Sequence, residues 1–227
     1  MDKNFRNGFI ANLPIGISVF AYGAVLGVLC VQKDIEFYQL ALMNIFIFAG
    51  SSQFVIVDMW NTTLDIIGVT IAALLVNLRY FLVTASLNTL FVGTSKTQKF
   101  KYMHFVTDEC WAITMQRLKQ ESITPMFLLG GGVCIFSVWF AGTSLGYFLG
   151  DFIQSPEKYG LDFAFIAIFL ALAISMYKGK ENIIPWLITI VSAFAFEQLI
   201  DGKIYIVLAA ILGAFSAVVF SKDERYG

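Results

Sequence analysis

Charged residues are scarce in this sequence. Of its 227 residues, 14% are Asp, Glu, Lys or Arg and 58% are hydrophobic. A soluble domain has about 25% charged and about 45–50% apolar residues, so this composition does not provide a surface that water can cover. The formal net charge of -1 also gives no sign of a nucleic-acid partner. The scarcity of charge indicates an integral membrane protein surrounded by lipid.

Histidine and cysteine are also rare. His104 is the single histidine, and the three cysteines, Cys30, Cys110 and Cys134, are far apart. This pattern fits neither a metal-binding spacing nor a disulfide framework, and no P-loop motif is present. We therefore expect no metal and no cofactor, and we expect the three thiols to lie in apolar surroundings.

Long apolar segments make up most of the chain. A helix that spans a bilayer needs about 20 apolar residues. The candidates are 9–31, 38–57, 66–92, 126–150, 163–178, 183–200 and 204–220. The first is too long for the apolar part of a signal peptide and lacks a small-residue cleavage site, so we expect it to stay as a transmembrane helix. Residues 1–227 form a single integral membrane domain in this interpretation.

The basic residues constrain the topology of these segments. Lys and Arg cluster near the N-terminus, in 93–122 and near the C-terminus, whereas 58–65 has none. Cytoplasmic loops carry the excess of Lys and Arg. If the N-terminus is cytoplasmic, all the basic loops lie on the cytoplasmic side only when segment 38–57 enters and leaves the membrane on the same side. We therefore expect an all-α polytopic protein with six or seven transmembrane helices and a re-entrant or broken 38–57. The alternative is that all seven segments span and the charge rule fails locally.

The centre of 38–57 has the composition of a broken helix. Gly50 permits unusual backbone torsions, and Ser51, Ser52 and Gln53 carry polar groups that lipid cannot satisfy. Non-helical backbone at membrane depth is tolerated only where protein or a watery cavity covers it. A cavity is therefore predicted here, and a close contact between helices is the alternative.

Small residues mark further features. Three stripes predict close helix contacts: Gly16, Gly23 and Gly27; Gly142, Gly146 and Gly150; and Ala209, Gly213 and Ala217. Glycines at 130–132 suggest a hinge or a broken helix, and Pro14 fits the first turn of a helix better than a kink. A faint likeness between 48–52 and 140–144 suggests a weak inverted repeat.

Arg79 is the most informative polar residue. It lies near the middle of an apolar run, with Asn77 two residues away, and an arginine at a helix centre costs about 2.5–3.5 kcal/mol. It therefore faces protein, water or an anion. The functional interpretation is an anchor for a carboxylate, and the alternative is a structural ion pair with Asp108, Glu109 or Glu197. Residues 107–119 also have the pattern of an ordinary capped helix.

Four short motifs resemble the AzlC-type branched-chain amino acid permease family. They are Asn12-Leu13-Pro14-Ile15-Gly16, Phe48-Ala49-Gly50-Ser51-Ser52-Gln53-Phe54, Val76-Asn77-Leu78-Arg79-Tyr80 and Thr107-Asp108-Glu109. Ser51, Ser52 and Tyr80 depart from that family's common residues and make the site more hydroxylated. The resemblance implies the large subunit of a two-component secondary transporter, with a small AzlD-type membrane partner. It implies export of branched-chain amino acids, and in some members methionine, across the bacterial inner membrane.

These arguments together predict a substrate site. We expect Arg79 to hold the carboxylate of an amino acid, with Asn77 and the segment Gly50–Gln53 around its backbone. The ammonium is expected to meet carbonyls freed by the break, or the side-chain oxygens within that segment. Asp108, Glu109 and Pro14 are candidates for coupling or gating.

Two other classes of function compete with a transporter. An intramembrane protease would have to pair Ser51 or Ser52 with His104, and no elbow motif for a nucleophilic serine is present, so we expect no enzyme. A passive channel or a membrane scaffold subunit is the second alternative.

Overall fold

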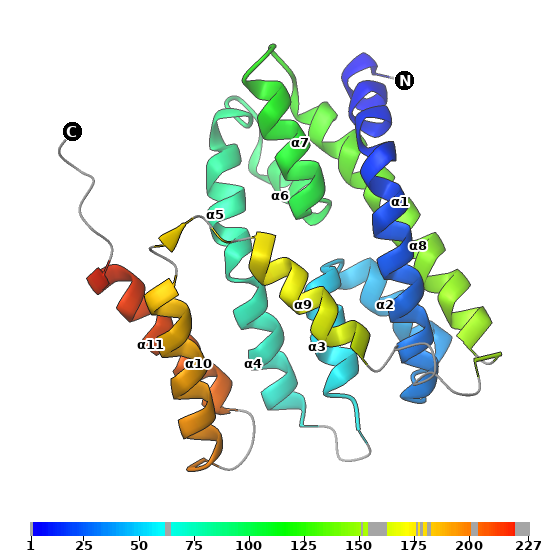
Figure 1. The fold of residues 1–227 in the computed structure, drawn as a ribbon. Coiled ribbons are helices and arrows are strands. Elements are labelled where there is room, and N and C mark those ends of the chain that lie inside the picture. The colour runs from blue at the N-terminus through cyan, green and yellow to red at the C-terminus, as the bar shows by residue number, and fades with distance from the viewer. Residues whose placement is uncertain are drawn as a thin grey trace.

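The computed structural model describes residues 2–61, 65–150, 152–153, 163–175, 177, 179–180, 183–200 and 204–220. Within these ranges all regular structure is helical (Figure 1). The helices are α1 (Lys3–Gln32), α2 (Phe37–Phe46), α3 (Gly50–Asp58), α4 (Ile66–Asn77), α5 (Arg79–Ser86), η1 (Leu87–Thr89), α6 (Lys96–His104), α7 (Asp108–Leu118), α8 (Pro125–Gly150), α9 (Ala164–Ser175), α10 (Ile183–Glu197) and α11 (Ile204–Phe220). The all-α polytopic class predicted from the sequence is confirmed.

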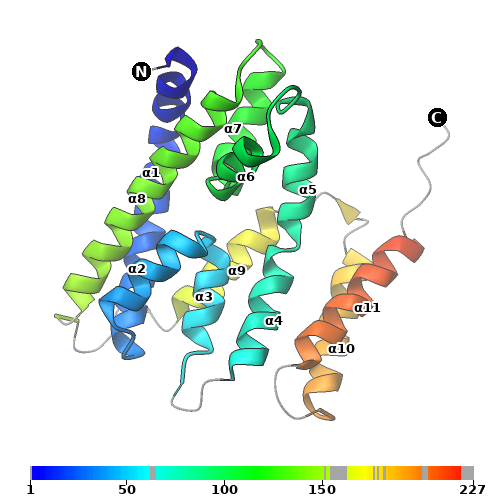
Figure 2. The same ribbon diagram turned by 180° about the vertical axis from the view of Figure 1, so that it is seen from behind.

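Three stretches are long and apolar enough to cross a membrane, among the residues described: Lys3–Gln32, Ile66–Thr89 and Pro125–Gly150. They define the two ends of the molecule. We call the end at which α1 begins the first face and the end at which α1 finishes the second face, at the top and bottom of Figure 1. The helices α4 and α5 together run from the second face to the first, and α8 returns to the second, as Figures 1 and 2 show.

The helices α1 and α8 form the closest helix pair of the fold. Glycines on each helix face the other helix: Gly8 meets the backbone of Phe127, Gly146 meets the backbone of Ala24, and Gly150 meets the side chain of Val31. The contacts advance together along both helices, so the two run parallel. The first two predicted glycine stripes thus serve one interface, in which small residues let the backbones approach.

The segment 38–57 is broken, as the sequence predicts. The helices α2 and α3 form a hairpin that enters from the second face and returns to it (Figures 1 and 2). Lys33, before α2, donates a hydrogen bond of 3.3 Å from Nζ to the carbonyl oxygen of Asp58, where α3 ends. The tip of this hairpin, residues 47–49, lies in the middle of the bundle.

The polar segment 93–122 is not a simple surface loop. The helices α6 and α7 form a second hairpin, on the side of the first face, and its tip reaches inward. The tip residues Val106 and Thr107 are buried. The Phe105 ring lies 6.4 Å from the Phe48 ring, and both rings contact Phe136 of α8, at 5.7 and 5.0 Å. The two hairpins therefore meet tip to tip inside the protein.

The order of elements shows an inverted repeat. Each hairpin is followed by a spanning element, and the second unit enters from the opposite face. Offsets of 59, 58 and 59 residues separate the starts of α2 and α6 (Phe37, Lys96), α3 and α7 (Gly50, Asp108), and α4 and α8 (Ile66, Pro125). The register differs from the one expected. With these offsets Phe48 corresponds to Val106 or Thr107 and not to Phe140, which lies inside the uninterrupted α8.

Two local expectations were wrong. The helix α8 continues through Gly130, Gly131 and Gly132 without a break, because these glycines admit the backbones of Phe5 and Phe105 and the side chain of Asn12. Pro14 is not in a first turn, since α1 already begins at Lys3 and Pro14 lies within it. The helix begins earlier because the Asp2 side chain caps it by accepting from the backbone N–H of Asn4 at 2.7 Å.

The α1–α8 interface predicts that replacing glycine by alanine affects stability differently at two positions. A methyl group in Gly146→Ala would collide with the Ala24 carbonyl, whereas in Gly16→Ala it would meet only the Val138 side chain at 3.4 Å. We expect Gly146→Ala to destabilise the protein by about 1–3 kcal/mol and Gly16→Ala to change little. Thermal unfolding in detergent measures both variants. Equal melting temperatures would contradict this account of the interface.

The hairpin topology predicts sidedness. Single cysteines at the exposed positions Asp34 and Asn61 should react with an impermeant thiol reagent from one side of the membrane, and cysteines at Thr97 and Gln120 from the other. The native thiols are buried, so the unmodified protein is the unlabelled control. If Asp34 and Asn61 react from opposite sides, α2 and α3 together span the membrane and the re-entrant arrangement is excluded.

Candidate functional site

The break between α2 and α3 brings a helix N-terminus into the middle of the protein. The unusual torsion falls on Phe48, with φ of 35°, and not on Gly50, so a non-glycine residue adopts a sparsely populated conformation at the tip. Gly50 is required for another reason: a methyl group there would lie 3.0 Å from the Trp139 ring. The indole therefore covers the start of α3 directly.

A buried polar network holds this hairpin against α8. Asn44 donates from Nδ2 to Thr143 Oγ1 at 2.8 Å, and its Oδ1 accepts from Gln53 Nε2 at 2.8 Å and from Trp139 Nε1 at 3.0 Å. Trp139 Nε1 also donates to Gln53 Oε1 at 3.0 Å. Because buried polar groups are costly unless they are paired, this network fixes α2, α3 and α8 relative to one another.

The N-terminus of α3 has no cap. Ala49 precedes it and offers no side-chain acceptor, and the first turn has no acidic residue. The backbone N–H groups of Gly50, Ser51 and Ser52 donate no hydrogen bond within the described parts of the chain. The first N–H groups of a helix and its dipole favour an anion, so this end of α3 is an electropositive point.

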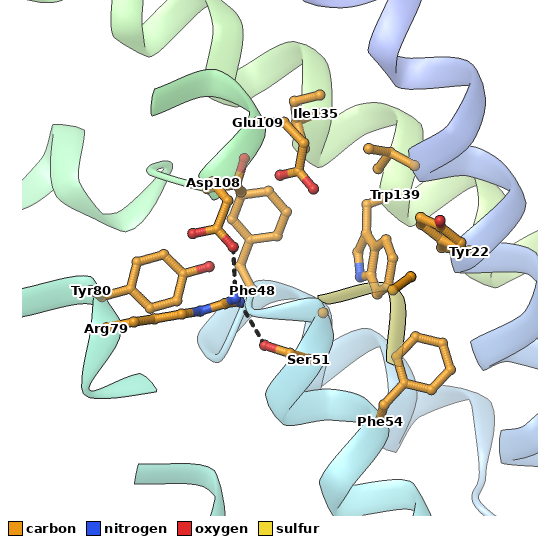
Figure 3. Close-up of a pocket in the computed structure, with 14 residues that line it drawn as sticks. Tyr22, Phe48, Ser51, Phe54, Arg79, Tyr80, Asp108, Glu109, Ile135 and Trp139 are labelled. Atoms are coloured by element: carbon orange, nitrogen blue, oxygen red, sulfur yellow. Dashed lines mark hydrogen bonds and ion pairs between the residues drawn. The ribbon is translucent and has the colours of Figure 1, made fainter. Parts of the chain in front are cut away.

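Arg79 lies beside that electropositive end. The turn at Leu78 between α4 and α5 directs its side chain towards α3 and α7 (Figure 3). Its Nη1 pairs with Asp108 Oδ2 at 2.9 Å, and its Nη2 donates to Ser51 Oγ at 2.8 Å. The buried Nε has no hydrogen-bond partner. Arg79 therefore forms an ion pair, as the structural alternative predicted. Its Nε–H remains an unpaired donor.

The second hairpin supplies the acids. Thr107 caps α7, with its hydroxyl oxygen accepting from the Cys110 N–H at 3.4 Å, and Asp108 and Glu109 occupy the first turn. The capped-helix interpretation of 107–119 is therefore also correct. Glu109 has neither a hydrogen bond nor an ion pair with any residue the structure describes, and Figure 3 shows its carboxyl group pointing into the pocket between Asp108 and Trp139.

These elements enclose a cavity of about 250 Å³. Its walls carry one guanidinium, two carboxylates and a large apolar surface. The lining residues are Val19, Tyr22, Phe48, Gly50, Ser51, Phe54, Arg79, Tyr80, Thr107, Asp108, Glu109, Ile135, Trp139 and Ala171. Pockets for drug-sized ligands occupy about 300–1,000 Å³, so this cavity suits a smaller molecule with a charged end and an apolar end.

The predicted site residues fall into two groups. Arg79, Gly50, Ser51, Asp108 and Glu109 line the cavity. The others lie outside it. Ser52 and Gln53 are buried behind its wall, where Ser52 donates to Asn77 Oδ1 at 2.8 Å, and Pro14 lies on an exposed part of α1. Ser52, Gln53 and Asn77 therefore support the cavity wall from behind. Pro14 is not part of the cavity.

The sequence arguments did not identify Tyr80 and Trp139 as walls of the cavity, or the polar network behind Trp139. Tyr80 lies with its ring centre 5.4 Å from Arg79 Cζ, which is close enough for a cation–π contact, and Trp139 covers Gly50. A signal was available: Asn44 and Trp139 both carry polar groups within apolar segments. Such groups need buried hydrogen-bond partners, and in this structure they bond each other.

The fold and this cavity define a polytopic helical membrane protein with a polar site between two re-entrant hairpins. The family model described as AzlC protein matches residues 14–153. The chain belongs to the AzlC protein family. Its match includes both hairpins, both spanning elements after them and most of the cavity wall.

Curated relatives match nearly the full length. An uncharacterized membrane protein of Helicobacter pylori is 26% identical over 97% of this chain and 96% of its own length. The branched-chain amino acid transport protein AzlC of Bacillus subtilis is 23% identical over 94% and 85%, and the inner membrane protein YgaZ of Escherichia coli is 23% identical over 96% and 91%. No solved structure matches the chain.

The ion pair predicts the consequence of removing its acid. Asp108→Asn leaves the Arg79 guanidinium without its ionic partner, and we expect a loss of about 1–3 kcal/mol in stability. The double variant Arg79→Met with Asp108→Leu should recover that loss, because an apolar pair can replace a buried ion pair. Thermal unfolding measures this, with the exposed Asp34→Asn as control. A single variant as stable as the native protein would contradict it.

Proposed function

We propose that this chain is the large subunit of a two-component secondary transporter, which exports branched-chain amino acids, and also methionine, across the bacterial inner membrane. The names of the Bacillus subtilis and Escherichia coli relatives support amino acid transport and an inner-membrane location. The observation that carries the proposal is the position of Arg79 on the wall of a cavity that is otherwise largely apolar. Residues 1–227 act as one transport domain in this proposal.

Arg79 and the N-terminus of α3 receive the substrate carboxylate. Both present donors at the same wall of the cavity: the guanidinium, and the unpaired N–H groups of Gly50 and Ser51. A guanidinium suits a carboxylate because it offers parallel donors, and half-helix N-termini bind anionic substrate groups in other transporters. Arg79 then contacts both Asp108 and the substrate carboxylate. Substrate binding is thereby linked to the contact between the two hairpins.

The apolar wall receives the side chain. Phe48, Phe54, Ile135 and Trp139 surround the remaining volume, and they offer contacts but no hydrogen bond that would distinguish one aliphatic chain from another. A single methylene in such a pocket changes the binding free energy by about 1–3 kcal/mol. The pocket therefore accepts leucine, isoleucine, valine and methionine with modest preferences.

The partner, the membrane orientation and the coupling residues are proposed from the resemblance of the motifs and from the positions of the charged residues. The small AzlD-type subunit is proposed as the partner. The N-terminus is placed in the cytoplasm, because the first face carries the basic residues of α1 and α6 and such residues stay inside. Asp108 and Glu109 are proposed to take part in coupling or gating, since they connect the α6–α7 hairpin to the site.

The proposal predicts the effect of one conservative substitution. Arg79→Lys keeps a positive charge but loses the planar donor pair, so leucine counterflow in proteoliposomes should fall about tenfold or more, as expected for lost hydrogen bonds to a charged group. The assay is run with and without a co-purified small subunit. We expect activity to require that subunit, and we expect unlabelled leucine on one side of the membrane to drive a transient accumulation of labelled leucine from the other side.

Arg117→Lys is the matched control, since Arg117 is half exposed and pairs with Glu121 outside the cavity. If Arg79→Lys transports leucine with unchanged rate and half-saturation, Arg79 is a structural residue only and the proposed site is wrong. If labelled leucine only equilibrates across the membrane, with no transient accumulation driven by unlabelled leucine, the protein is a passive channel instead.

A further inference from the structure

The side chains of the cavity carry an unequal number of charges. Arg79 and Asp108 compensate each other through their contact of 2.9 Å. Glu109 also faces the cavity, and no cation contacts it within the described residues. Its carboxyl group is therefore the one charged group lining the cavity for which the described part of the chain supplies no partner, and a partly enclosed carboxylate gains strongly from a nearby cation.

The side-chain oxygens of Ser51, Ser52 and Gln53, which were also expected to meet the ammonium, are already engaged. Ser52 and Gln53 are fully buried and bonded to Asn77 and to the Asn44–Trp139 network. Ser51 accepts from Arg79 through its hydroxyl oxygen. These oxygens therefore do not form the acceptor cluster that an ammonium group requires, although they lie close to the break.

From this arrangement we propose that Glu109 binds the α-ammonium group of the substrate and that the site thereby selects amino acids over the corresponding carboxylic acids. This inference rests on the proposed function, because it takes Arg79 and the start of α3 as the carboxylate site. Figure 3 shows Glu109 on the upper wall, across the pocket from Ser51, with Trp139 beside it. A zwitterion bound between these walls places its carboxylate towards α3 and its ammonium towards α7.

Charge balance explains the selectivity. A zwitterion adds one charge of each sign, so its carboxylate meets Arg79 and its ammonium compensates Glu109. A carboxylic acid without the amino group adds only a negative charge to a cavity that already has two carboxylates and one guanidinium. Unpaired like charges are an effective means of rejecting a competitor. The same argument excludes N-acetylated amino acids and 2-oxo acids.

The experiment compares two ligands that share a carboxylate and an isobutyl group. Equilibrium binding of leucine and of 4-methylpentanoate is measured on the full chain in lipid nanodiscs, together with its small subunit if the two co-purify. Glu109→Gln should weaken leucine by about 10- to 100-fold, the range for a lost hydrogen bond to a charged group. It should leave 4-methylpentanoate unchanged or make it bind more tightly, so the preference between the two ligands falls.

Three further variants separate the role of Glu109 from other causes of weaker binding. Arg79→Lys should weaken both ligands by similar factors, because both carry the carboxylate. Glu197→Gln makes the same chemical change as Glu109→Gln, at an exposed residue near the end of α10, and should alter neither ligand. Glu109→Asp keeps the charge and should retain part of the preference for leucine.

The outcomes distinguish the two proposals. If Glu109→Gln leaves leucine binding unchanged, or weakens both ligands equally, Glu109 does not bind the ammonium, and the proposed function stands on Arg79 alone. If the native protein binds neither ligand, or if Arg79→Lys leaves both unchanged, the carboxylate site is wrong and this inference fails with it. A Glu109→Gln protein that fails to fold is replaced by Glu109→Asp, whose preference for leucine must then fall.

Discussion

The Arg79 guanidinium in the middle of an apolar bundle is the constraint to which the rest of the structure responds. A charge at this depth requires partners, and they come from two parts of the chain that are distant in sequence. Ser51 reaches it from one hairpin and Asp108 from the other. The ion pair therefore holds together the two halves of the inverted repeat, which also meet through Phe48 and Phe105.

Each hairpin presents a helix N-terminus to the same cavity, but only one of the two N-termini is capped. The start of α7 is capped by Thr107 and carries two acids in its first turn, whereas the start of α3 has neither a side-chain cap nor an acid. One wall therefore contributes negative side chains and the other contributes unpaired N–H groups. Two units of similar build thus produce a cavity with opposite electrical character at its two walls, which is the character of a zwitterion.

Much of the helical framework could be predicted from the sequence, because apolar length and small residues are local signals. The break in 38–57 followed from Gly50 and three polar neighbours, and the charged centre followed from Arg79 alone. The second hairpin was not recognised, because Lys96, Lys99 and Lys101 make 93–122 resemble a polar loop. The pairing of Asn44 with Trp139 and the correspondence of the two hairpins could not be deduced either, because they depend on contacts between distant residues.

The equivalence of the hairpins bears on the direction of movement through the protein. One hairpin lies between the cavity and the second face, and the other lies on the side of the first face. Two barriers of comparable architecture, inserted with opposite polarity, do not make the cavity a one-way valve. In the proposed transporter, the direction of net flux would therefore follow from the concentrations and gradients on the two sides and not from the fold.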